Sequence, residues 1–207
     1  RQILERRGTV IGAHACRIGG VLDAPFDPVA VSAAELNALN TRFFAVRDAK
    51  AEEAMRAEIE RARLAADSVG GVIEWAAVGV PAGVGSPMFG GVENVFASIL
   101  YGIPAVKGVE FGAGFGVADM RGSENNDPFY YDETGAVRTR TNHAGGILGG
   151  ITTGMPLLFR IAVKPTPSIG QAQQTVDLAE KKDAALTIRG RHDPCIVPRA
   201  IPVAEAC

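Results

Sequence analysis

The sequence predicts an α+β fold in which antiparallel sheets pack against a few helices. Short apolar or alternating segments, such as residues 9–16 and 72–80, are separated by glycine-rich turns and are typical of strands. Residues 48–68 form the one long amphipathic helix, in which Met55 and Ile59 begin an apolar stripe at helical spacing. The chain has no sustained strand–helix–strand alternation, which argues against a doubly wound parallel sheet.

Turn and cap signals set the other elements. Ser32 followed by Glu35 predicts a short helix within residues 23–47, and Gly70-Gly71 ends the long helix. In chain order, the further elements are a helix ending at Gly8, a glycine-rich loop over 81–91, a helix over 93–101, a strand over 105–111, a polar excursion over 124–141, a strand over 157–163, and a hairpin of 175–178 with 185–189.

Two finer expectations come from the same patterns. Alternation in the 105–111 strand places Val106 and Glu110 on one face, with Lys107, Val109 and Phe111 on the other. Residues 200–207 read as a helix that begins rather than ends. We therefore expect the natural polypeptide to extend past both ends of this chain.

Composition limits the classes of function. The chain has 207 residues, enough for one sizeable domain, with 47% hydrophobic and 21% charged residues. A net charge of −2 gives no general attraction to nucleic acid or to an acidic membrane, and no apolar run approaches the ~20 residues that span a bilayer. Cys16, Cys195 and Cys207 are an odd number without metal-ligand spacing. They predict a reducing, cytoplasmic setting and no metal site.

The segment 142–170 stands out because six glycines surround one short apolar run. Arg160 and Lys164 share one face of the strand, and a Lys-Pro-Thr-Pro-Ser loop follows it. Two cations on one face suit an anionic ligand, and they equally suit an amphipathic strand whose cations are solvated. The residues on the opposite, apolar face are Leu157, Phe159, Ile161 and Val163.

Other polar motifs carry less information. Gly112, Gly114 and Gly116 follow a strand, but no helix pattern follows them, so we reject a dinucleotide-binding fingerprint. His14, in an apolar strand, is more typical of a satisfied core residue than of a catalyst. The Arg-His-Asp sequence at 191–193 fits either a surface ion pair or an anion clamp beside an acid or base.

With these segments in view, the chain resembles the chorismate synthase family over essentially its whole length. The glycine-rich stretch at 141–154 and the segment beginning at Gly190 are the specific ones. The segments that carry the resemblance are residues 80–115, MRGSENND at 120–127, TNHAGGILGGITTG at 141–154, VKPTPSI at 163–169 and GRHDPCIVPRAIPVAEA at 190–206.

The resemblance implies a β-α-β sandwich with antiparallel sheets packed around helices, assembled as a homotetramer. It implies a lyase of the shikimate pathway, which makes chorismate for aromatic amino acid biosynthesis. The substrate would be 5-enolpyruvylshikimate 3-phosphate, and the reaction a trans-1,4-elimination of phosphate. The cofactor would be reduced FMN, although the reaction has no net redox change. NADPH would reduce the flavin through the enzyme's own activity or through a partner reductase.

The resemblance also implies roles for particular residues. Asp193 matches the aspartate that assists proton transfer near the flavin. The cofactor-binding positions it implies are Pro104, Ala105, Gly149, Lys164, Pro165, Thr166, Pro167, Ser168 and Arg191. The family's first half, with its histidines and phosphate-binding arginines, is not matched. We therefore expect residues 1–207 to be a single partial domain, incomplete for activity. The alternatives are a truncated homologue that only binds flavin or oligomerises, and an unrelated nicotinamide oxidoreductase.

Overall fold

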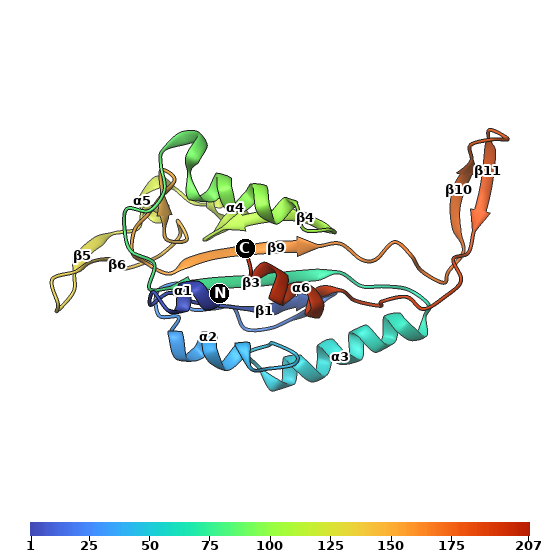
Figure 1. Cartoon of the computed structure of the whole chain (residues 1–207), viewed down its shortest axis with the longest axis horizontal. Coiled ribbons are helices and arrows are strands. Elements are labelled where there is room, and N and C mark those ends of the chain that lie inside the picture. The colour runs from blue at the N-terminus through green and yellow to red at the C-terminus, as the bar shows by residue number, and fades with distance from the viewer.

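The centre of the molecule is a five-stranded antiparallel sheet, seen across the middle of Figure 1 in a computed structural model that describes all 207 residues. Every strand pair in it is antiparallel. The predicted α+β class with antiparallel strands is therefore confirmed. In sheet order the strands are β2 (Val21–Leu22), β1 (Val10–Ile18), β3 (Gly71–Val78), β9 (Leu157–Val163) and β4 (Val106–Phe111).

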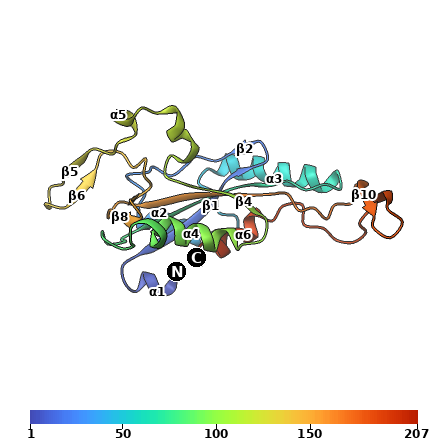
Figure 2. The ribbon, with the colours of Figure 1, turned by 90° about the horizontal axis from the view of Figure 1, so that it is seen from above.

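One face of this sheet holds the main core. Strand register aligns Trp75 with Phe159 and Phe159 with Phe111, and the Trp75 and Phe159 rings stack with centroids 4.5 Å apart. Phe96 of α4 (Val92–Tyr101) packs on both rings at 5.5 Å. Helix α6 (Val197–Ala204) adds Val197, and Figure 2 shows α4, α6 and the short α1 (Gln2–Glu5) on the same side of the sheet. The alternation predicted for β9 places its apolar residues on this face.

The opposite face is covered by α2 (Ala33–Asn40), while α3 (Ala49–Leu64) runs along the β1–β2 edge. The hydroxyl of Ser32 accepts the backbone N–H of Glu35, which confirms the predicted helix start. Leu36 of α2 is fully buried and lies so close to β1 that a Cβ at Gly12 would be 3.0 Å from it. This contact needs a glycine in β1 at that position.

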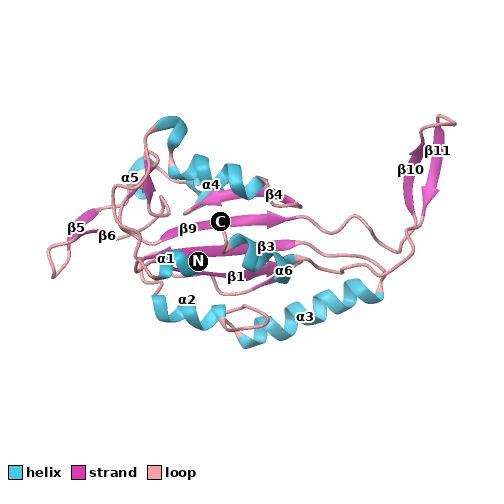
Figure 3. Ribbon diagram, in the orientation of Figure 1, coloured by secondary structure: helices cyan, strands magenta, loops and turns pink.

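Three two-stranded hairpins and short helical turns complete the chain (Figure 3). The β10–β11 hairpin projects from the body, and its existence confirms the predicted hairpin with shifted ends. These elements are η1 (Met88–Gly90), η2 (Gly114–Asp119), α5 (Gly122–Asn125), β5 (Phe129–Tyr131), β6 (Val137–Thr139), β7 (Ile147–Leu148), β8 (Ile151–Thr152), β10 (Gln173–Asp177) and β11 (Lys182–Leu186).

Two predictions were wrong. A bulge at Lys107 lets Val106 pair with Val163 and Gly108 with Ala162. Val106 therefore faces the core together with Val109, and not the side of Glu110. Helix α6 begins at Val197, before residue 200, and ends at Ala204.

The structure also contains no helix long and apolar enough to cross a bilayer, and no cluster of three or more potential metal ligands.

Candidate functional site

The proline-rich loop, residues 164–168, is predicted to bind a ligand. It begins where β9 ends, beside the start of β4. The backbone N–H of Lys164 donates to the carbonyl of Ala105 over 2.9 Å. This bond holds residues 104–105 directly beside the first residue of the loop. Ala105 has a φ of +74°, a left-handed conformation that is unusual for a residue with a side chain. The structure therefore joins two of the predicted cofactor-binding segments.

A second set of contacts comes from residues 66–70, here named the clip loop, which connect α3 to β3. The Ser68 hydroxyl donates to the carbonyl of Thr166 over 2.6 Å, inside the proline-rich loop. The backbone N–H of Val69 donates to the carbonyl of Pro194 over 2.7 Å, in the Arg-His-Asp-Pro segment. The clip loop therefore bonds to two predicted site segments that lie far apart in sequence.

A cavity of about 530 Å³ opens beside the clip loop. Arg191 lines it, is exposed, and makes no ion pair within the chain. Of the two arginines in its wall, Arg63 pairs with Glu60, so Arg191 is the one with a free guanidinium for an anionic ligand. Its lining residues are Arg63, Ala66, Asp67, Gly170, Ile188, Gly190, Arg191, His192, Asp193 and Pro194.

The expected pairing of Asp193 with Arg191 was wrong. Its carboxylate pairs with Arg199 of α6, and not with Arg191. The reason is that Arg199 lies on the first turn of α6, directly after the segment that carries Asp193. His192 has a structural contact, because its Nε2 lies 3.2 Å from the carbonyl of Ile188.

The donors of the proline-rich loop remain available. Lys164 makes no ion pair, and the buried Thr166 hydroxyl oxygen has no hydrogen-bond partner in the chain. A buried polar atom without a partner is costly. An ammonium group and hydroxyls on a stiff loop are donors for phosphate or for the carbonyl oxygens of a flavin ring. The residues present therefore fit a flavin nucleotide.

Arg160 is not part of this group. Its guanidinium pairs with Glu110 of the neighbouring strand over 2.8 Å. The sequence left open whether Arg160 and Lys164 bind an anion together. Because its guanidinium is already paired with Glu110, Arg160 is not available to such an anion.

His14 is a core residue, as predicted. It is fully buried, with Nδ1 2.9 Å from Asp23 and Nε2 3.0 Å from Glu74. Burial lowers the pKa of His14, but the hydrogen bonds and charges of the two carboxylates outweigh burial, so the pKa is raised overall. This cluster holds the loop before α2 to the sheet, because the backbone N–H of Phe26 also donates to Glu74 over 2.7 Å.

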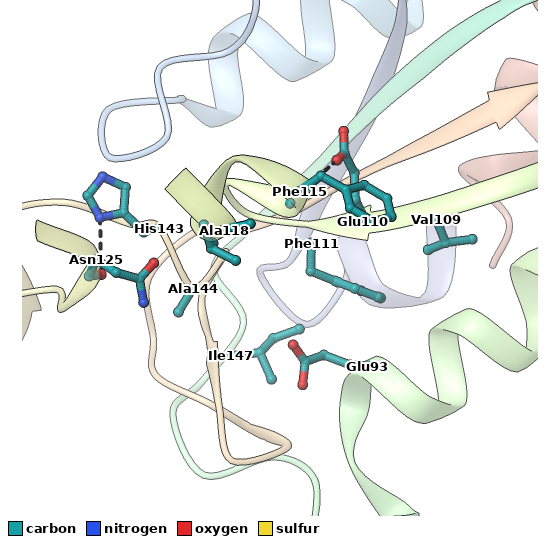
Figure 4. A pocket seen from close by; sticks show the side chains of 12 residues that line it. Glu93, Val109, Glu110, Phe111, Phe115, Ala118, Asn125, His143, Ala144 and Ile147 are labelled. Atoms are coloured by element: carbon teal, nitrogen blue, oxygen red, sulfur yellow. Dashed lines mark hydrogen bonds between the residues drawn. The ribbon is translucent and has the colours of Figure 1, made fainter. Parts of the chain in front are cut away.

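A second cavity, of about 450 Å³, lies at the opposite end of the sheet (Figure 4). Its walls are largely apolar, with Phe111 and Ile147 facing Glu93, and burial raises the pKa of the Glu93 carboxyl. No lysine or arginine lines it. It is therefore poorly suited to a phosphate, and the clip-loop cavity is the better candidate.

Comparison with known proteins identifies the family. The family model described as chorismate synthase matches residues 1–207. The chain belongs to the chorismate synthase family. Chorismate synthases of Thermococcus kodakarensis and Pyrococcus abyssi are 50% and 51% identical to it, over 100% and 99% of this chain. A solved structure described as "Crystal Structure of Chorismate Synthase" superposes over 99% of the chain, with a TM-score of 0.78 and 26% identity.

The chain spans about half the length of these chorismate synthases: 56% of the Thermococcus kodakarensis protein, 55% of the Pyrococcus abyssi protein and 56% of the chain in the solved structure. Within it, most of the cofactor-binding positions implied by the chorismate synthase resemblance lie at one end of the sheet. The exception is Gly149, in the turn between β7 and β8. That hairpin precedes the start of β9, whereas the proline-rich loop follows its end. The structure does not bring Gly149 to the other positions.

Sequence patterns missed the residues that hold the candidate site segments in place. Ser68 and Gly70 were visible only as the end of a helix, and Arg199 lies in the matched segment 190–206 but had no role assigned to it. The Ser68 side chain bonds to a carbonyl group 98 residues away, and no local sequence pattern predicts such a contact.

Proposed function

We propose that this chain is the carboxyl-side part of a chorismate synthase. The complete enzyme converts 5-enolpyruvylshikimate 3-phosphate to chorismate by trans-1,4-elimination of phosphate, and it uses reduced FMN. The observation that carries the proposal is that the clip loop bonds to both residues 164–168 and Pro194, while Ala105 bonds to Lys164, in a chain that matches the family over its whole length.

The binding roles follow from the chemistry of the residues present. Lys164 and Arg191 supply positive charge, and Thr166 and Ser168 supply hydroxyls. Ala105 is small and lets a flat ring approach the backbone. Pro104, Pro165 and Pro167 have restricted backbones, which reduces the entropy lost when the site is ordered. Reduced FMN, when bound, supplies reducing power that the protein side chains lack.

Asp193 is the residue that would accept or donate a proton in this half of the enzyme. Its side chain is 40% exposed and stands in the wall of the cavity beside Arg191. The ion pair with Arg199 orients the carboxylate, and a carboxylate is a group that can accept a proton in general acid–base catalysis.

The decisive experiment is chorismate formation under anaerobic conditions with FMN reduced beforehand. The full-length polypeptide that carries this chain should release phosphate and chorismate in equal amounts. Adding oxidised FMN with NADPH then separates an intrinsic flavin reductase from a need for a partner enzyme. FMN binding without any chorismate formation by the full-length protein would contradict the proposal.

The same proposal includes a cytoplasmic homotetramer that uses a small substrate and binds neither nucleic acid nor membrane. Exposed apolar residues on the helix-covered face support a sandwich that is completed by further polypeptide, since Val95 and Ile99 of α4 and Val203 of α6 lie uncovered. Sedimentation of the full-length protein at several concentrations tests the assembly, and a monomer throughout would contradict it.

The share of the relatives that this chain spans favours one second candidate, a homologue that binds flavin or oligomerises without catalysis. The intact mass of the natural protein separates the two. A mass close to 21.6 kDa, with FMN binding and no turnover, would favour the second candidate.

A further inference from the structure

We propose that the clip loop, residues 66–70, is the element that positions the two flavin-binding segments against each other, with Ser68 as its principal positioning residue. The inference rests on the proposed function, because it assigns a task within that same site. It concerns residues that contact the site segments, and not residues that contact a substrate.

The first step is that the clip loop has a firm base. Helix α3 ends with the backbone N–H of Asp67 donating to Ala62 over 2.9 Å and that of Ala66 donating to Arg63 over 3.1 Å. Ala66 has a φ of +52° there, the left-handed conformation that ends helices. The loop therefore extends from the chain's longest helix in a defined direction.

The second step is that the proline-rich loop and the two residues Gly170 and Gln171 after it are bonded to the clip loop and the end of α3 at three points. Ser68 donates its hydroxyl to Thr166. The backbone N–H of Gly170 donates to Ala66 over 3.0 Å, and the side-chain amide of Gln171 donates to the carbonyl of Ala65 over 2.9 Å. Of these three bonds, only the one from Ser68 reaches residues 164–168. Residues 164–168 have two other bonds, from the Lys164 backbone N–H to Ala105 and from the Gln173 side chain to Pro167, so loss of the Ser68 bond would loosen the loop chiefly at Thr166, whose hydroxyl has no partner.

The third step is that the other segment is bonded to the same loop. Val69 donates to Pro194, the residue after Asp193, through its backbone N–H. Since Ser68 and Val69 are adjacent in sequence, the two site segments are anchored to neighbouring residues of the clip loop. A shift of the clip loop would move Lys164 and Asp193 relative to each other, and small misplacements in an active site cost much activity.

Close packing fixes the end of the loop as well. A Cβ at Gly70 would lie 2.5 Å from the carbonyl oxygen of Val163 and 2.9 Å from Cδ of Pro165. Atoms this close must move, so a side chain at Gly70 would push the start of the proline-rich loop away from β3. Ser68 and Gly70 therefore act on the same loop, one by a bond and the other by the space it leaves.

The test compares Ser68→Ala with Ser68→Thr in the full-length protein, because threonine keeps the hydroxyl. Ser32→Ala is the matched control, since it removes a serine hydroxyl that caps α2 away from the site. Two quantities are measured: the Kd of FMN by fluorescence titration, and amide hydrogen exchange within residues 164–168 without flavin, which is read at Lys164, Thr166 and Ser168 because the two prolines have no amide hydrogen. For Ser68→Ala we expect exchange to become faster and the Kd to rise about three- to tenfold, the scale of one lost hydrogen bond. Ser68→Thr should restore both, and Ser32→Ala should change neither.

Unchanged exchange at residues 164–168 in Ser68→Ala would overturn the inference. If the wild-type protein binds no FMN, the proposed function fails, while the exchange measurement still decides the role of the clip loop. Gly70→Ala supplies a second variant, with Gly20→Ala as its control because a Cβ there meets no atom within 4 Å. A folded Gly70→Ala protein that binds FMN with wild-type affinity would also overturn the inference.

Discussion

The carboxylate of Asp193 pairs with the guanidinium of Arg199, six residues further along the chain. Arg199 lies in the first turn of α6, a helix whose apolar side, including Val197 and Ile201, is buried against the sheet. The position of the positive charge beside Asp193 is therefore set by the packing of α6 on the core. Arg191 is left free for a ligand.

Asp193→Asn should lower chorismate formation about 10²–10⁴-fold in the full-length enzyme, the usual contribution of a general acid or base. The change keeps the size of the side chain and affects a partly exposed ion pair, so the free energy of unfolding should change by less than ~1 kcal/mol. The measurement is single-turnover chorismate formation with FMN reduced beforehand. His192→Gln is the control and should cost far less. Wild-type turnover in Asp193→Asn, with flavin saturating, would contradict the assignment.

Lys164→Ala should weaken FMN binding by ~1–3 kcal/mol, the scale of a lost charge-assisted hydrogen bond. The measurement is a fluorescence titration, repeated at two salt concentrations, because a charge contribution decreases with ionic strength. Lys182→Ala, at the start of exposed β11, removes a cation away from the loop and should leave the affinity unchanged. Equal affinities for both variants would exclude Lys164 from the binding site.

The buried His14 cluster should make stability depend on pH. The pKa of His14 is raised above its ordinary value of 6.5, so its protonated form is favoured by folding. This contribution is complete below that ordinary value and is lost as the pH rises through the raised pKa. The pKa of Asp23 is lowered despite its burial, because His14 and backbone donors bond to the carboxylate, so its contribution is lost as the pH falls through the lowered pKa. We expect the urea concentration at the unfolding midpoint to be highest between the lowered pKa of Asp23 and the raised pKa of His14, and to fall at lower and at higher pH.

His14→Gln should remove the loss of stability on the alkaline side. It should also lower the free energy of unfolding by ~3–5 kcal/mol near neutral pH, since it leaves buried carboxylates without their cation. His192→Gln is the control, because His192 is only half-buried, contacts the backbone carbonyl of Ile188 and makes no ion pair. An unchanged alkaline slope in His14→Gln would show that another group titrates there.

The excursion over residues 124–141 should be mobile at its tip and fixed at its base. Asp127 holds the base by accepting the backbone N–H groups of His143 and Ala144 over 2.8 and 3.0 Å. Thr139 is 2% exposed, whereas the turn near Gly135 is exposed. Hydrogen exchange should therefore be slow at residues 139–144 and fast at residues 132–136. Uniformly slow exchange, with or without ligand, would contradict a flap.

The excursion over residues 124–141 lies beside the second cavity, at the other end of β9 from the proline-rich loop (Figures 1 and 4). The two segments are near each other in sequence, but the extended strand β9 separates them in space.

Local patterns predicted the elements whose causes are local. The stripe that contains Met55 and the cap at Ser32 gave α3 and α2 with only small errors at their ends. The face of Val106 was wrong because a bulge is a property of two paired strands, which one strand does not reveal. The bond from Ser68 was missed for a similar reason, because it joins residues 98 apart in the sequence. The ion pair of Asp193 joins residues only six apart, but it depends on where α6 begins and how that helix packs on the sheet.

The projecting β10–β11 hairpin has an entropic consequence for the two site segments that it connects. Strand pairing places Gln173 opposite Leu186, so the paired residues no longer count as free chain between Ser168 and Arg191. The free chain between them falls from 22 residues (169–190) to eight (169–172 and 187–190), and each halving of a loop lowers the entropic cost of bringing its ends together by about 0.6 kcal/mol. The hairpin thus raises the local concentration of one segment at the other, and it also contacts the proline-rich loop directly, because the side-chain amide of Gln173 donates to the carbonyl of Pro167 over 3.2 Å. Unzipping it with proline in β11 should loosen the pair even where the bonds from Ser68 and Val69 are retained.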